Sequence, residues 1–259
     1  MNARPGERLR PRTSPLRLFL TPAPWAATAY LVSYLVTGPV MFAFLVVVLV
    51  VAGVANITWL GLPLLVGAAE LVRGCSVVER WRALLVGSAF RGEYRPVVAN
   101  GILTHVRTRW TDPAILHGCA YFILIFPLML IWDAAALLVW LTMLALVTLP
   151  LWFWAIPQTW PNGETGRGLM IGSFPDGPDG GGVGLWIGDI GTALLVAAGG
   201  LVLAVLVGAH LVTAAARLHV GLARRMLGPP LDPLADAKRV LAGPGPLPDW
   251  TSTSGPRRP

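Results

Sequence analysis

A lone carboxylate, Asp133, interrupts a long apolar stretch of the chain about midway. A charged carboxylate at the centre of a membrane-spanning helix costs about 2.5–3.5 kcal/mol on insertion scales, so it usually needs a partner. Two hypotheses stay open. Asp133 faces a helix bundle as a proton-sensitive or ligand-sensing group, or it is protonated or hydrogen-bonded within the packing. Asp133 is therefore a candidate functional residue.

Histidine is the second residue type that could do chemistry, because it changes charge near physiological pH. His210 lies near the end of the last apolar segment and is a candidate switch, although a single histidine in this position is more often structural. His210 is not expected to pair with Asp133, because the two lie at different depths along their helices. His219 faintly resembles a kinase phosphoacceptor, but no nucleotide-binding motif follows it, so we do not assign it that role.

Metal sites and enzyme motifs are not indicated by the remaining residues. Asp176 and Asp179 could approach an extracellular Ca²⁺, but two acids make a weak site, and a flexible loop is the simpler interpretation. His105, His117 and the two cysteines lack zinc-binding spacing, and HExxH, GxSxG and P-loop motifs do not occur. The sequence therefore predicts no metal, no cofactor and no enzymatic activity.

The elements that position these residues are long apolar helices. Of 259 residues, 55% are hydrophobic and only 13% are charged, which is more apolar surface than a soluble domain of this size can bury. The apolar blocks are longer than the ~20 residues that a helix needs to cross a bilayer. The predicted fold is an all-α membrane protein, a four-span helical bundle.

The predicted domain organisation follows from where the apolar blocks begin and end. The four spans cover about residues 29–55, 57–75, 119–149 and 186–213. A Gly-rich outer loop is expected at 158–184, a basic tail at 1–28, and a disordered tail rich in Pro, Gly, Ser and Thr at 229–259. Residues 29–228 thus form the membrane domain.

Basic residues decide the predicted orientation. Five precede Tyr30, seven lie between Arg73 and Arg109, seven follow Thr213, and only Arg167 falls in the Gly-rich loop. By the positive-inside rule, both termini and the middle loop are cytoplasmic in a multi-pass protein of the cell membrane. The basic residues lie beside apolar blocks, so membrane lipid is the expected partner and nucleic acid is not.

Two pairs of opposite charges lie close to the predicted inner boundary. Glu70 with Arg73, and Glu79 with Arg82, are three residues apart and share a helical face. The second pair belongs to an amphipathic stretch that we expect at the membrane surface. We interpret the two pairs as anchors rather than as chemistry.

An internal repeat is indicated by two recurring dipeptides. Ala29-Tyr30 and Leu62-Pro63 recur as Ala120-Tyr121 and Leu149-Pro150, at offsets of 91 and 87 residues. Near-constant offsets suggest duplication of a unit with two spans and a cytoplasmic amphipathic helix. These two amphipathic helices are expected to end at Leu85-Val86-Gly87 and at Leu227-Gly228.

A set of short motifs between Trp25 and Gly228 carries a family resemblance. The motifs are Trp25 with Ala29-Tyr30, Gly61-Leu62-Pro63, Glu79-Arg80, Leu85-Val86-Gly87, Tyr94-Arg95-Pro96, Thr111-Asp112-Pro113-Ala114, Ala120-Tyr121, Phe126-Pro127 and Pro150-Leu151-Trp152-Phe153-Trp154. In combination they resemble the putative sensor domain family of actinobacteria, a membrane domain often found before a sensor histidine kinase. The chain departs from the family at Leu116-His117-Gly118, where Trp, Arg and Asp are usual.

The resemblance implies a membrane-embedded input module for signalling, here without a kinase. The function we expect is a non-enzymatic membrane sensor or scaffold that relays a membrane or extracytoplasmic cue to a cytoplasmic protein, such as a histidine kinase, with a homo-oligomer as a further expected partner. The alternative is a small transporter or permease subunit that uses Asp133 as its intramembrane polar group.

Overall fold

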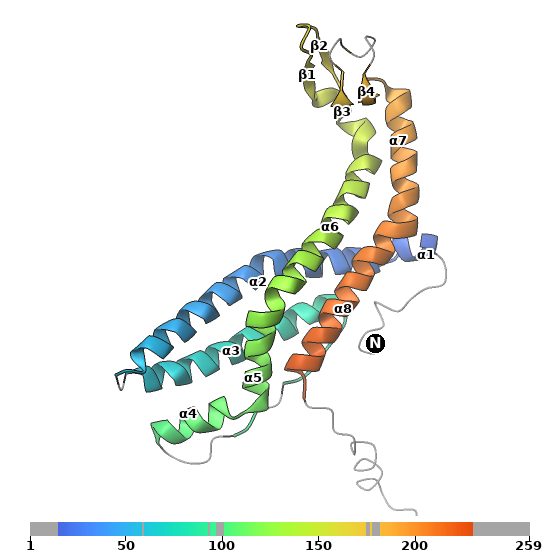
Figure 1. Ribbon diagram of the computed structural model, residues 1–259. Coiled ribbons are helices and arrows are strands. Elements are labelled where there is room, and N and C mark those ends of the chain that lie inside the picture. Colours follow the sequence, from blue (N-terminus) through green and yellow to red (C-terminus); the bar gives the residue numbers. More distant parts are fainter. Residues whose placement is uncertain are drawn as a thin grey trace, which may run out of the picture. The chain divides into compact units, whose positions relative to one another are not determined.

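Long helices dominate the part of the chain that the structure describes (Figure 1). The computed structural model describes residues 15–58, 60–92, 94–96, 101–174, 177 and 182–229. Four helical segments there are long and apolar enough to cross a membrane: Pro22–Ala55, Gly61–Val86, Pro113–Leu151 and Ile190–Leu227. The predicted four-span, mainly helical membrane protein is confirmed at this level.

The first long helix, α2 (Pro22–Ala55), follows the short helix α1 (Pro15–Phe19). The predicted irregular tail was therefore wrong for residues 15–28, and residues 1–14 lie outside the described part of the chain. Pro22 and Pro24 fall in the first turn of α2, where backbone N–H groups have no partner within the helix. Proline is compatible with that turn, so it does not mark the edge of a tail here.

The second long helix, α3 (Gly61–Ala83), runs on through the 3₁₀ turn η2 (Leu84–Val86). The sequence predicted a separate surface helix after position 75, and this was wrong because one helix continues through that position. Gly74 alone does not break the helix, which ends only at Gly87, where φ is 72°. Helices α2 and α3 pack side by side.

Two short helices follow, α4 (Ile102–Trp110) and α5 (Pro113–Cys119). Helix α4 packs against α3, because the Trp110 indole N–H donates to the Leu65 carbonyl over 3.1 Å. The Glu70 carboxylate accepts from Arg73 at 3.0 Å and from Arg109 of α4 at 2.9 Å. The Glu70 pair therefore fastens α4 to α3 and remains partly exposed, which agrees with an anchoring role.

The third and fourth long segments each contain a π-helical turn. The third runs through α5, η3 (Ala120–Ile125) and α6 (Phe126–Thr148), and the fourth through α7 (Ile190–Leu203), η6 (Ala204–Gly208) and α8 (Ala209–Leu227). In the third, the wide turn immediately precedes Pro127, whose ring would otherwise clash with the preceding turn. Asp189 caps α7, and hydrogen bonds from the Thr192 hydroxyl and backbone N–H lower the pKa of its carboxyl.

The connection between α6 and α7, where the sequence predicted a Gly-rich outer loop, contains regular structure in its described residues. After the 3₁₀ turns η4 (Leu149–Leu151) and η5 (Phe153–Ala155), two antiparallel hairpins form. They pair β1 (Pro157–Thr159) with β2 (Thr165–Arg167), and β3 (Leu169–Ser173) with β4 (Val183–Ile187). The Trp160 and Trp186 rings meet edge to face at 5.1 Å, a contact that a composition argument does not reveal. Asp176 and Asp179 lie outside the described residues.

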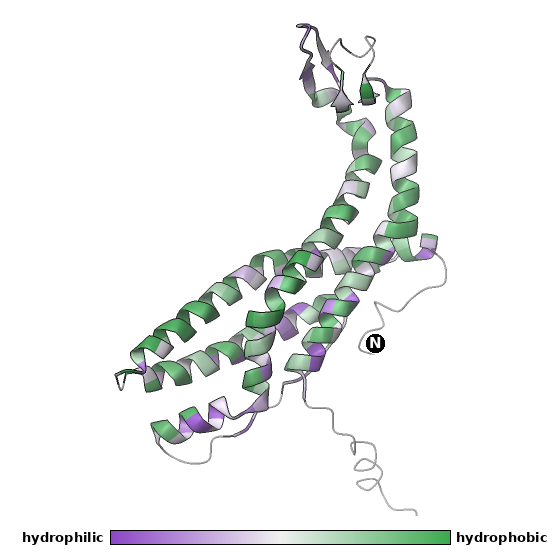
Figure 2. Cartoon of the chain, viewed as in Figure 1, coloured by the Kyte–Doolittle hydropathy of each residue, from purple (hydrophilic) through white to green (hydrophobic). Residues whose placement is uncertain are grey.

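Apolar residues make up most of the long helices, as the hydropathy colouring in Figure 2 shows, and many of them are exposed. On α2, Val36 and Phe44 are 66% and 62% exposed, and on α6 and α7, Leu128 and Leu195 are 64% and 76% exposed. A helix that is apolar all round belongs in a large core or in a membrane. Lipid is the solvent that suits these faces.

Small residues let α6 and α7 approach closely. Substitution of two adjacent glycines of α7 tests this close packing. A Cβ at Gly200 would lie 2.7 Å from the Leu146 Cβ, whereas a Cβ at Gly199 meets nothing within 4 Å. We expect Gly200→Ala to lower the free energy of unfolding by about 1–3 kcal/mol through overpacking. Gly199→Ala should change it by less than about 0.5 kcal/mol. Equal unfolding curves for the two variants in detergent would contradict the close packing.

Candidate functional site

Asp133 does have a partner, and the partner is His219. The carboxylate Oδ2 of Asp133, on α6, is hydrogen-bonded to Nδ1 of His219, on α8. The other ring nitrogen of His219, Nε2, lies 2.9 Å from the hydroxyl of Tyr121, in the π turn η3. All three side chains are buried, so an Asp–His–Tyr chain links the third and fourth long segments inside the protein.

A second set of buried groups joins α2 to α3. The Tyr30 hydroxyl donates to Glu79 Oε1 over 2.7 Å, and the other oxygen of Glu79 pairs with Arg82. Arg82 also donates from Nη2 to the Tyr30 carbonyl over 2.8 Å and from Nε to the Ser33 hydroxyl over 3.0 Å. The guanidinium thus meets acceptors on both helices.

The two sets meet at the imidazole ring of His219. Glu79 Oε1 lies 3.7 Å from His219 Nε2, and the Tyr34 ring contacts the imidazole edge to face at 4.3 Å. The Arg82 guanidinium lies over the Tyr34 ring at 4.9 Å. We call this connected set the buried polar network. Its members are Tyr30, Ser33, Tyr34, Glu79, Arg82, Tyr121, Asp133 and His219.

Helical spacing brings the network together. On α2, Tyr30, Ser33 and Tyr34 are three and four residues apart and so share a face. On α3, Glu79 and Arg82 share a face in the same way. On α8, the buried positions around His219 include the small residues Ala215 and Ala216, which leave room for neighbouring helices.

The network is closed to water. Its ionisable members Glu79, Asp133 and His219 have no exposed surface, and Arg82 is only 6% exposed. Burying an isolated charge is costly, so the charges must balance locally. Arg82 balances Glu79. Asp133 is balanced only when His219 is protonated or when the carboxyl itself holds the proton.

One proton therefore changes both the charge and the hydrogen-bond directions of the network. If Asp133 is ionised, a neutral His219 donates from Nδ1 to the carboxylate and accepts the Tyr121 hydroxyl at Nε2, which leaves one negative charge unbalanced. A protonated His219 donates from both nitrogens, so the Tyr121 oxygen must accept instead. Asp133 Oδ1 has no hydrogen-bond partner within the part of the chain that the structure describes. The direction of the hydrogen bond between His219 and Tyr121 therefore depends on the charge of the imidazole ring.

The other candidate, His210, lies apart from the network. Its side chain is exposed on α8, and Asp133 is bonded to His219 rather than to it. The expectation that His210 and Asp133 do not pair agrees with this placement. His219 was considered only as a phosphoacceptor, and its role as the partner of Asp133 was missed.

The anchor interpretation was wrong for Glu79 and Arg82. Their spacing correctly indicated a shared face, but that face is buried against α2 and α8 rather than exposed at a membrane surface. The only signal in the sequence was the run of small or apolar residues on the same face of α3, Ala68, Val72, Cys75 and Ser76, all of which are buried.

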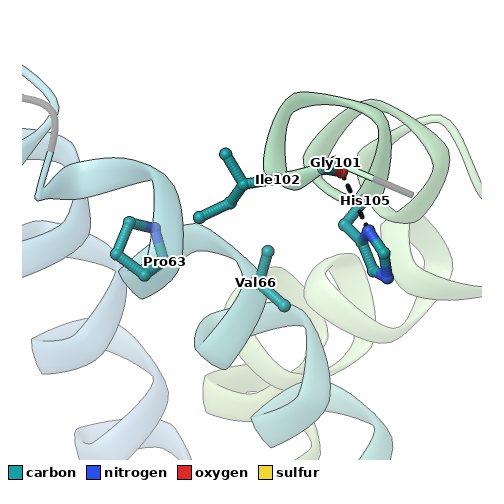
Figure 3. A pocket seen from close by; sticks show the side chains of 5 residues that line it. All are labelled: Pro63, Val66, Gly101, Ile102 and His105. Atoms are coloured by element: carbon teal, nitrogen blue, oxygen red, sulfur yellow. Dashed lines mark hydrogen bonds between the residues drawn. The ribbon is translucent and has the colours of Figure 1, made fainter.

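A shallow apolar hollow lies elsewhere, between α3 and α4. It has a volume of about 360 Å³ and is lined by Pro63, Val66, Gly101, Ile102 and His105 (Figure 3). The His105 ring is hydrogen-bonded to the Gly101 carbonyl at 2.9 Å, as the dashed line shows. None of the described residues that line it is a charged partner for this histidine, and we assign the hollow no chemistry.

Comparison with known families decides the class of the protein. A family model described as Putative sensor matches residues 30–227. The chain belongs to the Putative sensor family. The match begins at Tyr30 and includes every member of the buried polar network. Comparison with curated proteins and with solved structures found no match.

Family membership confirms the resemblance inferred from the sequence motifs. Three of those motifs supply network residues, namely Ala29-Tyr30, Glu79-Arg80 and Ala120-Tyr121. With four apolar helices, a sensor family supports a role in sensing for this multi-pass membrane protein. The family description names no ligand, so the mechanism must be argued from the site.

Proposed function

We propose that this protein is a non-enzymatic sensor located in the cell membrane. In this proposal, the buried polar network determines how its four long helical segments pack. One observation carries the proposal. The network takes an ionisable or phenolic side chain from every long segment: Tyr30, Glu79, Asp133 and His219. Each long segment is hydrogen-bonded through these buried groups to one other segment, and the contacts of His219 with Glu79 and Tyr34 join the two pairs.

Two packing arrangements of such a bundle form a switch. Packed cores shift between discrete arrangements rather than deforming continuously, so a small change at the network becomes a rigid movement of helices. Glu79 and His219 lie close to the C-terminal ends of α3 and α8, which end at Gly87 and Gly228. A change in the packing around Glu79 and His219 would therefore move these two C-terminal ends.

The relay leads to a cytoplasmic partner such as a histidine kinase. The distribution of basic residues supports an orientation with both termini and the loop after α3 in the cytoplasm. In this orientation the ends of α3 and α8 face the cytoplasm together. A partner that contacts both ends would read their relative position.

Asp133→Asn tests the proposal, because the amide keeps the size of the side chain but loses its charge. A photo-crosslinker at Arg224, in the last turn of α8, reports partner contact in cells. We expect Asp133→Asn to change the crosslinking yield by about 5-fold or more, the lower end of typical coupling between sites. His210→Gln is the matched control, since His210 is exposed on α8 and should leave the yield unchanged.

Two results would contradict the proposal. A crosslinking survey that finds no cytoplasmic partner would remove the relay. Solute flux in proteoliposomes that Asp133→Asn abolishes would favour a transporter instead. The burial of the network argues against that outcome, because a solute path needs polar groups in contact with water.

A further inference from the structure

A basic hollow lies outside the network, at the C-terminal end of α3. It has a volume of about 350 Å³ and is formed by the last turns of the helix and the segment after Gly87. Among the residues that the structure describes, its lining includes Arg80, Trp81, Leu84, Phe90, Arg91 and Gly92, and none of these carries a carboxylate. Two guanidinium groups from positions on either side of the Gly87 turn therefore share one open site.

The guanidinium of Arg80 is held in place by its surroundings. Its Nη1 lies 3.4 Å from the Tyr94 hydroxyl. The backbone at Gly92 passes so close that a Cβ there would lie 2.4 Å from the same nitrogen. Arg73 lies over the Tyr94 ring at 4.5 Å, which fixes that ring in turn. Neither Arg80 nor Arg91 forms an ion pair within the part of the chain described.

Apolar side chains beside the arginines are exposed. Trp81 is 72% exposed and Leu84 53% exposed, both on the last turns of a helix apolar enough to span a membrane. Tryptophan concentrates where a bilayer meets water, and arginine forms bidentate hydrogen bonds with phosphate oxygens. The hollow therefore combines positively charged arginines in its lining with exposed apolar side chains beside them.

We propose that this hollow binds the phosphate of an anionic phospholipid, with Arg80 and Arg91 on the headgroup and with Trp81 and Leu84 beside the acyl chains. Charge complementarity favours an anionic headgroup, because the described residues of the lining carry two positive side chains, Arg80 and Arg91. A free anion would leave the exposed indole and leucine without an apolar neighbour. The proposal does not depend on the role of the buried polar network.

The test uses the full chain in nanodiscs and measures co-purified lipid and its affinity. Nanodiscs of phosphatidylcholine with added phosphatidylglycerol are compared with nanodiscs of phosphatidylcholine alone. We expect Arg80→Gln with Arg91→Gln to weaken phosphatidylglycerol binding by about 30-fold, which corresponds to about 2 kcal/mol at 1.4 kcal/mol per tenfold. Thermal unfolding of each variant verifies that it has folded.

A second double variant separates a defined site from diffuse attraction. Arg224→Gln with Arg225→Gln removes the same charge from the basic end of α8, outside the lining of the hollow. It should weaken binding by less than about 3-fold, because surface charges are largely screened at physiological salt. Equal losses in the two double variants would overturn the site. Inorganic phosphate that binds in phosphatidylcholine nanodiscs as tightly as phosphatidylglycerol would overturn the assignment to lipid.

Discussion

Arg82→Met is expected to lower the free energy of unfolding by about 3–5 kcal/mol, because it leaves a buried carboxylate without its counter-charge. Glu79 has no exposed surface and would keep only the Tyr30 hydroxyl as a donor over 2.7 Å. The Tyr30 carbonyl and the Ser33 hydroxyl would lose their hydrogen bonds to the guanidinium as well. Equilibrium unfolding in mixed micelles measures the loss.

The same helix supplies a matched control. Glu70 and Arg73 have the same spacing as Glu79 and Arg82, but their side chains are 47% and 29% exposed. Arg73→Met should cost less than about 1 kcal/mol, as for most exposed ion pairs. Adding Glu79→Gln to Arg82→Met should recover part of the stability, because no charge is then left unbalanced. If Arg82→Met cost no more than Arg73→Met, the buried pair would not hold the helices together.

The helices could be predicted from the sequence because membrane insertion depends on local composition. Long apolar runs require lipid whatever their packing, so the number of spans followed without a structure. Boundaries depended on more than composition. The start of α2 at Pro22 and the continuation of α3 past position 75 were missed, since neither is marked by a change in hydropathy alone.

The site was only half predictable for a related reason. Asp133 could be recognised from the sequence because a carboxylate in an apolar helix has a high free-energy cost of membrane insertion. This cost depends on one residue alone. Its partner depends on how helices cross. The predicted span began at residue 119, but this helical segment begins at Pro113, and its Asp133 meets α8 at His219. Counting residues along a single helix does not give the register between two helices.

The predicted internal repeat also relates two hydrogen bonds of the site to each other. Tyr30 and Tyr121 occupy equivalent positions in the two copies, and each hydroxyl bonds to a residue near the end of its own copy. Glu79 stands eight residues before Gly87, and His219 nine before Gly228. This similarity supports the predicted duplication, with a tyrosine in each copy bonded to a polar residue near the C-terminal end of that copy. The duplication itself stays a prediction.

The bond between Asp133 and His219 should be the other large contribution to stability. His219→Leu removes the only hydrogen-bond partner that Asp133 has in the described chain, and it also removes the partner of the Tyr121 hydroxyl. We expect the free energy of unfolding to fall by about 3–5 kcal/mol, with a similar fall for Asp133→Leu. His210→Leu, on an exposed position of α8, should change it by less than about 0.5 kcal/mol.

A double-mutant cycle then separates the bond from the cost of burying each group. Asp133→Leu with His219→Leu removes both polar groups and leaves apolar side chains of similar size, so it should cost less than the sum of the two single variants by about 2–3 kcal/mol. Unfolding of all four proteins in the same micelles gives this coupling energy. If the two losses simply added, Asp133 and His219 would act independently, and the α6–α8 contact could not serve as the switch between packing arrangements.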